Sequence, residues 1–188
     1  MMMTSLSALL VPILVASVLV FIASSLVHMV LPWHKSDYPK MSNEDQVMDA
    51  LRPLAIPPGD YIVPRPSDMK DMKSPEFLAK FARGPVFMMT VMPGGTMNMG
   101  PQLIRWFCFC VVVSIFSGFV AGSALVPGVS GSAAFHFSAL TAFASYSLAY
   151  WPMSIWYHRA WSITVKQTID GLIYACLTGA AFMWFWPK

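Results

Sequence analysis

A chain of 188 residues with 56% hydrophobic and 11% charged residues has too little charge to cover a water-soluble fold, because soluble proteins carry about 45–50% apolar and about 25% charged residues. The formal net charge of +3 is small, and no run of Lys and Arg alternates with aromatic residues, so no nucleic-acid partner is expected. These properties favour an integral membrane protein.

The first predicted membrane span runs from Leu9 to Leu31 without a charged residue. About 20 apolar residues, each rising about 1.5 Å, cross a hydrocarbon core of about 30 Å. A cleavable signal peptide is the competing interpretation, but Met1 to Ser7 carries no basic residue and the run exceeds the usual apolar region of about 7 to 15 residues. We therefore expect residues 1–31 to form a retained transmembrane helix.

Residues 32–102 predict a small mixed α+β insert outside the membrane. Ser42, with Asp45 three residues later, predicts a short helix to about Leu51, and Ser74-Pro75 with Gly84 predicts a second one. The insert has few large apolar residues for its length, so we expect it to rest against the membrane helices.

Extended segments are predicted between and after these two helices. Tyr61–Val63 follows a Pro- and Gly-rich turn, and Phe87–Met92 and Thr96–Met99 flank Pro93-Gly94-Gly95 as the strands of a hairpin do. A hairpin of the last two stretches is therefore expected, with a loop as the alternative.

Residues 103–188 contain three further predicted spans, Leu103–Leu125, Ala133–Tyr150 and Ile169–Phe185. Each carries small residues at helical spacing, which allow close helix contact in lipid. They are Ser114, Gly118 and Gly122; Ala134, Ser138, Ala142 and Ser145; and Gly171, Ala175 and Gly179. The expected fold is an all-α membrane protein: a four-helix transmembrane bundle with the insert between helices 1 and 2, and with the first helix more peripheral.

Aromatic and basic residues predict the membrane interface and the orientation. Tryptophans lie at the ends of the apolar runs or in the link 151–168, where indole prefers the headgroup level. Lipid-headgroup or interface positions are assigned to Arg105, Trp106, Trp156, Arg159, Trp161 and Lys166. Basic residues favour the cytoplasm, so the insert is predicted to be cytoplasmic and both termini periplasmic.

Several short motifs point to a family. They are Pro57-Pro58-Gly59-x-Tyr61-x-x-Pro64, Lys73-Ser74-Pro75-Glu76, Gly84-Pro85, Thr90-Val91-x-Pro93-x-Gly95 and Ile169-Asp170-Gly171-Leu172-Ile173-Tyr174. Together they resemble a family of small bacterial inner-membrane proteins with four spans and no assigned activity, over most of the chain. The resemblance implies a bacterial inner membrane and this topology, and it implies no catalytic residue.

Two groups of residues are candidates for metal binding. His28, His34 and His158 are expected on one membrane face, where Asp37 completes a set of nitrogen and oxygen ligands. Met97 and Met99 offer thioethers, which favour copper(I). The alternatives are interfacial histidines bonded to backbone, water or headgroups, and methionines that fill packing gaps.

Asp170 is the one acidic residue near a span, and an ionisable group there is a candidate for proton or ion movement. The alternative is a structural pair with Arg105, Arg159 or Lys166 near a helix N-terminus. Asp170 and His158 are together a candidate ion-pair or polar site.

No nucleophile elbow, phosphate-binding glycine loop or paired carboxylates occur. The first functional hypothesis is therefore a non-enzymatic accessory subunit or assembly factor of a larger membrane complex, without a cofactor. Its partners are the bilayer and other membrane-protein subunits or copies of itself. The alternatives are a protein that handles copper or a small ligand, and a lipid-modifying enzyme at the cytoplasmic interface.

Overall fold

The computed structural model describes residues 4–188, so the first three residues of the predicted segment 1–31 lie outside the described residues. The chain divides into two compact units. The helical unit comprises residues 4–39 and 98–188, and the insert unit comprises Lys40–Met97. The insert predicted at 32–102 is longer than this unit at both ends.

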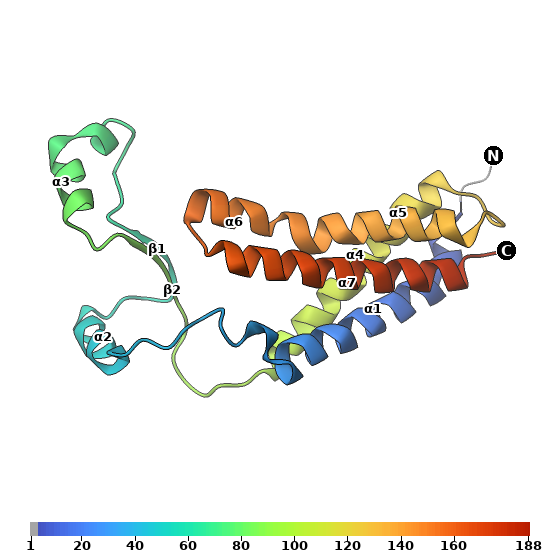
Figure 1. Cartoon of the computed structure of the whole chain (residues 1–188), viewed down its shortest axis with the longest axis horizontal. Helices are drawn as coiled ribbons and strands as arrows, with labels where there is room; N and C mark the ends of the chain where they lie inside the picture. Colours follow the sequence, from blue (N-terminus) through green and yellow to red (C-terminus); the bar gives the residue numbers. More distant parts are fainter. Residues whose placement is uncertain (1–3) are drawn as a thin grey trace. The chain divides into compact units, whose positions relative to one another are not determined.

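Three helices of the helical unit are long and apolar enough to cross a membrane (Figure 1). They are Leu6–Val30, Gly100–Ala124 (α4) and Trp161–Phe185 (α7), with 25 residues each. The first contains α1, Leu10–Ser25, and ends in a π-helical turn at Leu26–Val30. Helices of this number, length and composition fit a multi-pass membrane protein.

The region of the third predicted span is helical but interrupted. It consists of α5 (Gly131–Phe143), a π-helical turn at Ala144–Leu148 and α6 (Tyr150–Tyr157). It is not among the three membrane-length helices of the described residues, so the predicted fourth crossing is not confirmed. After a turn at His158, α7 begins at Trp161 rather than at Ile169, so most of the predicted link is helical.

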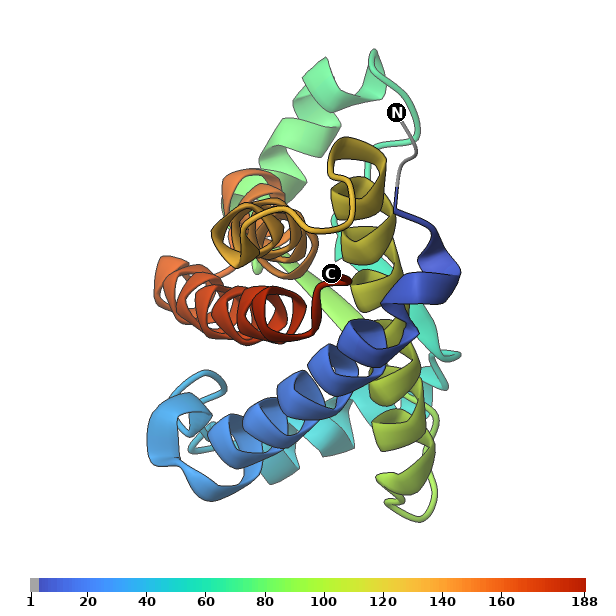
Figure 2. The same ribbon diagram turned by 90° about the vertical axis from the view of Figure 1, so that its right-hand side faces the viewer.

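The four helical segments run up and down, and the start of the first helix lies at the same end of this unit as the end of α7 (Figure 1). Helix α1 packs on α4 and α7, and α5 packs on the same two helices (Figure 2). Fully buried residues of α1 include Ala16, Ser17 and Val20, so the expectation of a peripheral first helix is wrong. The reason is that its small residues also allow close approach.

The predicted small-residue faces lie where the helices meet. Gly118 and Gly122 of α4 face Ile13 and Leu9 of the first helix, and Gly179 of α7 faces Phe135 of α5. The small residues of these faces in α4, α5 and α7 are all buried, and Ser145, in the π-helical turn after α5, is half-buried. This part of the sequence prediction is confirmed.

The insert unit contains α2 (Glu44–Leu51), β1 (Gly59–Val63), α3 (Pro75–Arg83) and β2 (Phe87–Val91). Ser74 caps α3 as predicted, since its Oγ accepts a hydrogen bond from the Phe77 N–H at 3.1 Å. Gly84 follows α3 with a φ of +57°, a region that favours glycine.

The predicted hairpin is wrong, because β2 pairs with β1 and not with Thr96–Met99. The strands are antiparallel, from Gly59 opposite Val91 to Val63 opposite Phe87. β1 offers Tyr, Ile and Val, which favour strands, whereas Thr96–Met99 contains Asn and Met. Thr90 Oγ1 also donates to Asp60 Oδ1 on the opposite strand at 2.6 Å.

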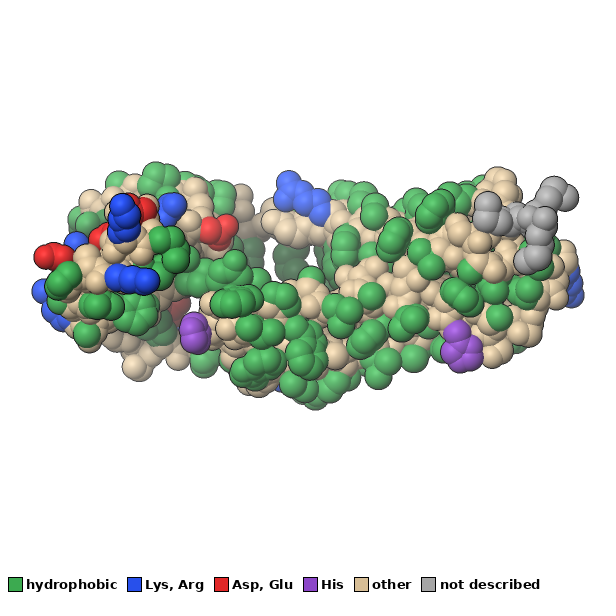
Figure 3. Space-filling model, turned by 90° about the horizontal axis from the view of Figure 1, so that it is seen from above, with side chains coloured by type: hydrophobic (Ala, Val, Ile, Leu, Met, Phe, Trp, Pro, Cys, Tyr) green, Lys and Arg blue, Asp and Glu red, His purple; other side chains and the backbone are tan. Residues whose placement is uncertain are grey.

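No residue between Lys40 and Met97, all of which the structure describes, is buried. Charged side chains gather on the visible face of the insert unit. The visible face of the helical unit has many hydrophobic side chains and few charged ones (Figure 3). The insert unit therefore has no apolar core of its own, as its composition led us to expect.

Candidate functional site

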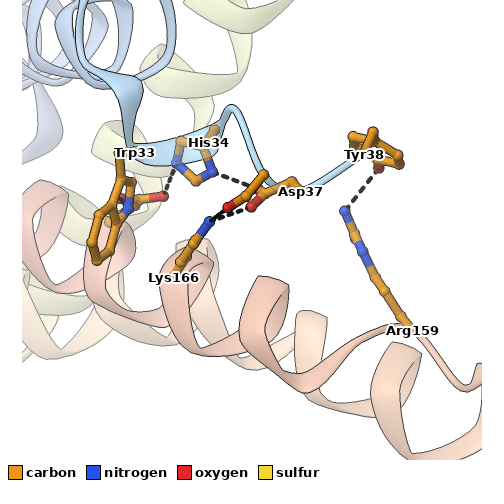
Figure 4. Close-up of polar contacts among 8 residues, drawn as sticks. Trp33, His34, Asp37, Tyr38, Arg159 and Lys166 are labelled. Atoms are coloured by element: carbon orange, nitrogen blue, oxygen red, sulfur yellow. Dashed lines mark hydrogen bonds and ion pairs between the residues drawn. The ribbon is translucent and has the colours of Figure 1, made fainter. Parts of the chain in front are cut away.

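A cluster of polar side chains forms where the segment after the first helix turns back onto α7 (Figure 4). A single 3-10 turn at Pro32–His34 presents Trp33 and His34 to that helix. Trp33 Nε1 donates to Asp170 Oδ1 at 3.2 Å, and His34 Nε2 lies 2.9 Å from Asp170 Oδ2. Asp170 is 1% exposed, so its carboxylate depends on these two partners.

Asp37 and Lys166 form the other half of the cluster. Asp37 Oδ2 lies 2.7 Å from His34 Nδ1, and Lys166 Nζ donates to Asp37 Oδ1 at 2.6 Å. Burial raises the pKa of Asp37, but hydrogen bonds from Lys166 and His34 outweigh it and leave the pKa below its ordinary value. Asp37 is therefore negatively charged at neutral pH.

Lys166 and Asp170 both reach the segment because they are four residues apart on α7, on one helix face. Lys166 Nζ also donates to Ser36 Oγ at 2.9 Å and lies 5.7 Å from the Trp33 ring centroid. Lys166 and Asp170 therefore both contact the turn after the first helix from one face of α7.

His34 lies between two carboxyl groups, with Asp37 next to its Nδ1 and Asp170 next to its Nε2. A neutral imidazole has one N–H, so it donates to one of Asp37 and Asp170 and faces the other with a lone pair. Two carboxylates stand against the single ammonium of Lys166.

His28 brings a third ligating group to the same place. Its ring contacts that of His34 at a centroid distance of 4.2 Å, and its side chain forms no hydrogen bond with the described residues. Ligating atoms of His28, His34 and Asp170 lie within 4.8 Å of one another. Tetrahedral zinc, with bonds of about 2.0–2.2 Å, holds neighbouring ligand atoms about 3.3 Å apart. Shifts of about 1 Å therefore gather the three atoms around one ion.

The environment of His34 also suits a metal ligand. Metal-bound histidines usually donate their second N–H to a carboxylate, which fixes the ring and directs the other nitrogen to the ion. Asp37 occupies that position next to Nδ1 and leaves Nε2 facing Asp170.

A cavity of about 380 Å³ lies beside His28. Two π-helical turns contribute to its wall, Leu26–Val30 and Ala144–Leu148. Such turns are rare and occur frequently at functional sites. The other lining residues come from the end of α1, from the first half of α4 and the residue before it, from the start of α6 and the residue before it, and from α7, so all four helical segments meet around it.

The predicted interface residues have different surroundings. Arg105, Trp156 and Trp161 are exposed. Trp106 instead faces the cavity, and its Nε1 donates to Ser24 Oγ at 2.7 Å. Arg159 donates to Tyr38 OH at 3.2 Å.

His158 does not belong to the cluster. It is exposed, and it forms the left-handed turn before α7 with a φ of +54°. Asp170 was expected to pair with Arg105, Arg159 or Lys166. Its contacts come instead from Trp33 and His34, and Lys166 binds Asp37.

The two methionines of the predicted copper site fall in different units. Met97 is 95% exposed and ends the insert unit. Met99 belongs to the helical unit and lines the cavity. Neither unit holds both thioethers.

Sequence reasoning missed Trp33 and the joining of His28 and His34 to Asp170. The available signal was the pair Lys166 and Asp170, which puts two charges on one face of an otherwise apolar helix.

Comparisons of the chain with protein-family models, with curated proteins and with solved structures find no match. The function proposed below is therefore inferred from the geometry of the site.

Proposed function

We propose that this chain is a multi-pass membrane protein that binds a divalent transition-metal ion through His28, His34 and Asp170. The observation that carries the proposal is the convergence of three ligating atoms within 4.8 Å, one from the end of the first helix, one from the turn after it and one from α7. Two imidazoles and a carboxylate suit Zn²⁺ and similar ions better than copper(I), which prefers sulfur.

The ligand number favours handling of the ion over a purely structural role. Structural zinc sites have four protein ligands, whereas three protein ligands leave a position for water or another molecule. An ionisable group such as Asp170 within a membrane-length helix is by default a functional residue.

We further propose four crossings of a bacterial inner membrane, with α5 and α6 as the third. The up-and-down order of the helical segments and the short turn between α4 and α5 support this topology. The positive-inside preference then puts the turn after the first helix, with its metal ligands, on the cytoplasmic side.

Metal analysis of the purified protein tests this function. The chain in mild detergent is stripped with a chelator, loaded with Zn²⁺, desalted and analysed by elemental mass spectrometry. We expect about one Zn²⁺ per chain. In parallel, Co²⁺ should give the visible absorption of a four-coordinate ion.

Variants separate this site from adventitious binding. His34→Gln and Asp170→Asn should abolish the stoichiometric ion. His136→Gln and His158→Gln change exposed histidines outside the cluster and serve as matched controls that keep it. Retention of the ion by both cluster variants, or its absence from the unchanged protein, contradicts the proposal.

The second candidate function is an accessory subunit of a larger complex. It is favoured by the insert unit, which has no buried residue and exposes large apolar side chains such as Leu54 and Met92. Native mass spectrometry after mild extraction should then show a stoichiometric protein partner. A monomer that retains the metal ion would leave the first candidate alone.

The lipid-modifying alternative gains no comparable support. No Lys or Arg lines the cavity among the described residues, so nothing there neutralises a phosphate group.

A further inference from the structure

The cavity beside His28 has a distinct chemical character. Its lining residues are Ser24, Ser25, His28, Met29, Met99, Gln102, Leu103, Trp106, Phe109, Ser145, Tyr146, Ala149, Tyr150, Gln167 and Tyr174. None carries a permanent charge, and five are Trp, Phe or Tyr. The volume of about 380 Å³ falls in the range of small-molecule sites, about 300–1,000 Å³.

Six polar side chains of this wall form no hydrogen bond with another of the residues 4–188, although each has a donor. They are His28, Gln102, Tyr146, Tyr150, Gln167 and Tyr174, and the hydroxyls of Tyr146 and Tyr174 are buried. Ser24, by contrast, is already bonded to Trp106, and Ser25 to the Phe21 carbonyl. The free donors are imidazole, phenol and amide groups, which favour a neutral ligand that carries hydrogen-bond acceptors.

The aromatic part of the wall narrows the ligand further. Trp106, Tyr146 and Tyr174 pack on one another with ring centroids 5.5–6.4 Å apart. Such faces stack on a flat ring, whereas a saturated lipid chain gains nothing specific from them. A fatty-acid or phospholipid headgroup would also need a cation, which this wall lacks.

We propose that the cavity binds a membrane-soluble quinone, with its carbonyl oxygens accepting hydrogen bonds from Tyr150, Gln167 or His28 and its ring against the aromatic side chains. The two π-helical turns that border the cavity widen the helices locally and account for the space. Binding alone is proposed here, without electron transfer. It does not depend on the metal ion.

The test uses the full chain in phosphatidylcholine nanodiscs and tritiated 2-methyl-1,4-naphthoquinone, measured by scintillation proximity with empty nanodiscs as background. We expect saturable binding that unlabelled naphthoquinone displaces. 2-Methylnaphthalene has the same ring system without carbonyl oxygens, so it should displace poorly.

Variants locate the binding. Tyr150→Phe and Gln167→Leu preserve volume and should each weaken binding about fivefold, the effect of one net hydrogen bond. Ala149→Trp fills the cavity and should abolish binding. Tyr157→Phe and Gln46→Leu, both exposed and outside the cavity, are matched controls that should bind normally.

Equal displacement by 2-methylnaphthalene, or unchanged affinity in both Tyr150→Phe and Gln167→Leu, would overturn the assignment and identify a cavity for hydrocarbon chains. Because these two variants keep all three metal ligands, their results stand apart from the zinc measurement. Asp170→Asn should lose the ion and still bind the naphthoquinone.

Discussion

The ion pair between Asp37 and Lys166 should stabilise the helical unit far more than an exposed contact between the same two segments. A double-mutant cycle tests this ion pair. The free energy of unfolding is measured for Asp37→Asn, for Lys166→Met and for the two combined, with a chelator present. The pair joins the turn after the first helix to α7, so its loss removes a contact between these two segments (Figure 4).

The magnitude follows from burial. The side chains are 6% and 16% exposed, and their N–O distance is 2.6 Å. Removal of one partner from a buried pair costs about 3–5 kcal/mol because the other charge is left unpaired. We expect about 3 kcal/mol for Asp37→Asn, since Lys166 keeps Ser36 and the Trp33 ring. The combined variant leaves neither charge, so the coupling free energy should be about 2 kcal/mol.

The control cycle joins the same two parts of the chain on the surface. Arg159 donates to Tyr38 OH at 3.2 Å, but Tyr38 is 78% exposed. Arg159→Met and Tyr38→Phe should therefore couple by less than about 0.5 kcal/mol.

Reversible unfolding by sodium dodecyl sulfate in mixed micelles, followed by circular dichroism, gives the free energy of unfolding of each variant. If the Asp37–Lys166 coupling is no larger than the Arg159–Tyr38 coupling, the argument from burial is refuted.

Three further predictions concern single positions. A Cβ at Gly171 would overlap Ser147 Oγ, so Gly171→Ala should lower the free energy of unfolding by about 1–3 kcal/mol, and Ser147→Ala in the same chain should recover part of it. The Tyr174 hydroxyl is buried without a hydrogen-bond partner, so Tyr174→Phe should leave that free energy unchanged or raise it by up to about 1 kcal/mol; a clear loss would show a missed partner. Hydrogen bonds from the Ser67 N–H and Oγ hold the pKa of Asp71 below its ordinary value. This contribution is present above the unfolded pKa of about 3.9 and is lost as the pH falls through the lower folded pKa. Hydrogen exchange at the Ser67 amide, corrected for intrinsic rate, should accelerate there, and Asp71→Asn should remove that pH dependence.

The long helices could be predicted because hydrocarbon leaves backbone groups no partner other than one another. Their faces were also predictable, since Gly118, Gly122 and Gly179 lie at the contacts that their spacing indicated. The start of α7 was missed because Trp161–Thr168 is too polar to extend an apolar run, yet it continues the helix beside α6.

The strand pairing was missed for a different reason. Pro93-Gly94-Gly95 is a strong local turn signal, but β2 found its partner about 30 residues earlier in β1, where branched and aromatic side chains offer better cross-strand contacts. A local signal gives no information about such a distant partner.

The cluster was half predictable. His28, His34 and Asp37 were expected on one side of the membrane, and Asp170 was singled out as an ionisable group near a span. Their convergence depends on the turn at Pro32–His34, which directs His34 to a carboxylate 136 residues later. No periodicity in the sequence encodes that contact.

The π-helical turn at Ala144–Leu148 fixes the rotational phase of α6. Each residue of an α-helix advances the chain by about 100°, so one residue added or removed there rotates everything downstream by that angle. In the present phase Ser154 Oγ lies 2.6 Å from Thr164 Oγ1 of α7. A chain one residue shorter at this turn would point Ser154 away from α7, so this short stretch should tolerate substitution far better than deletion.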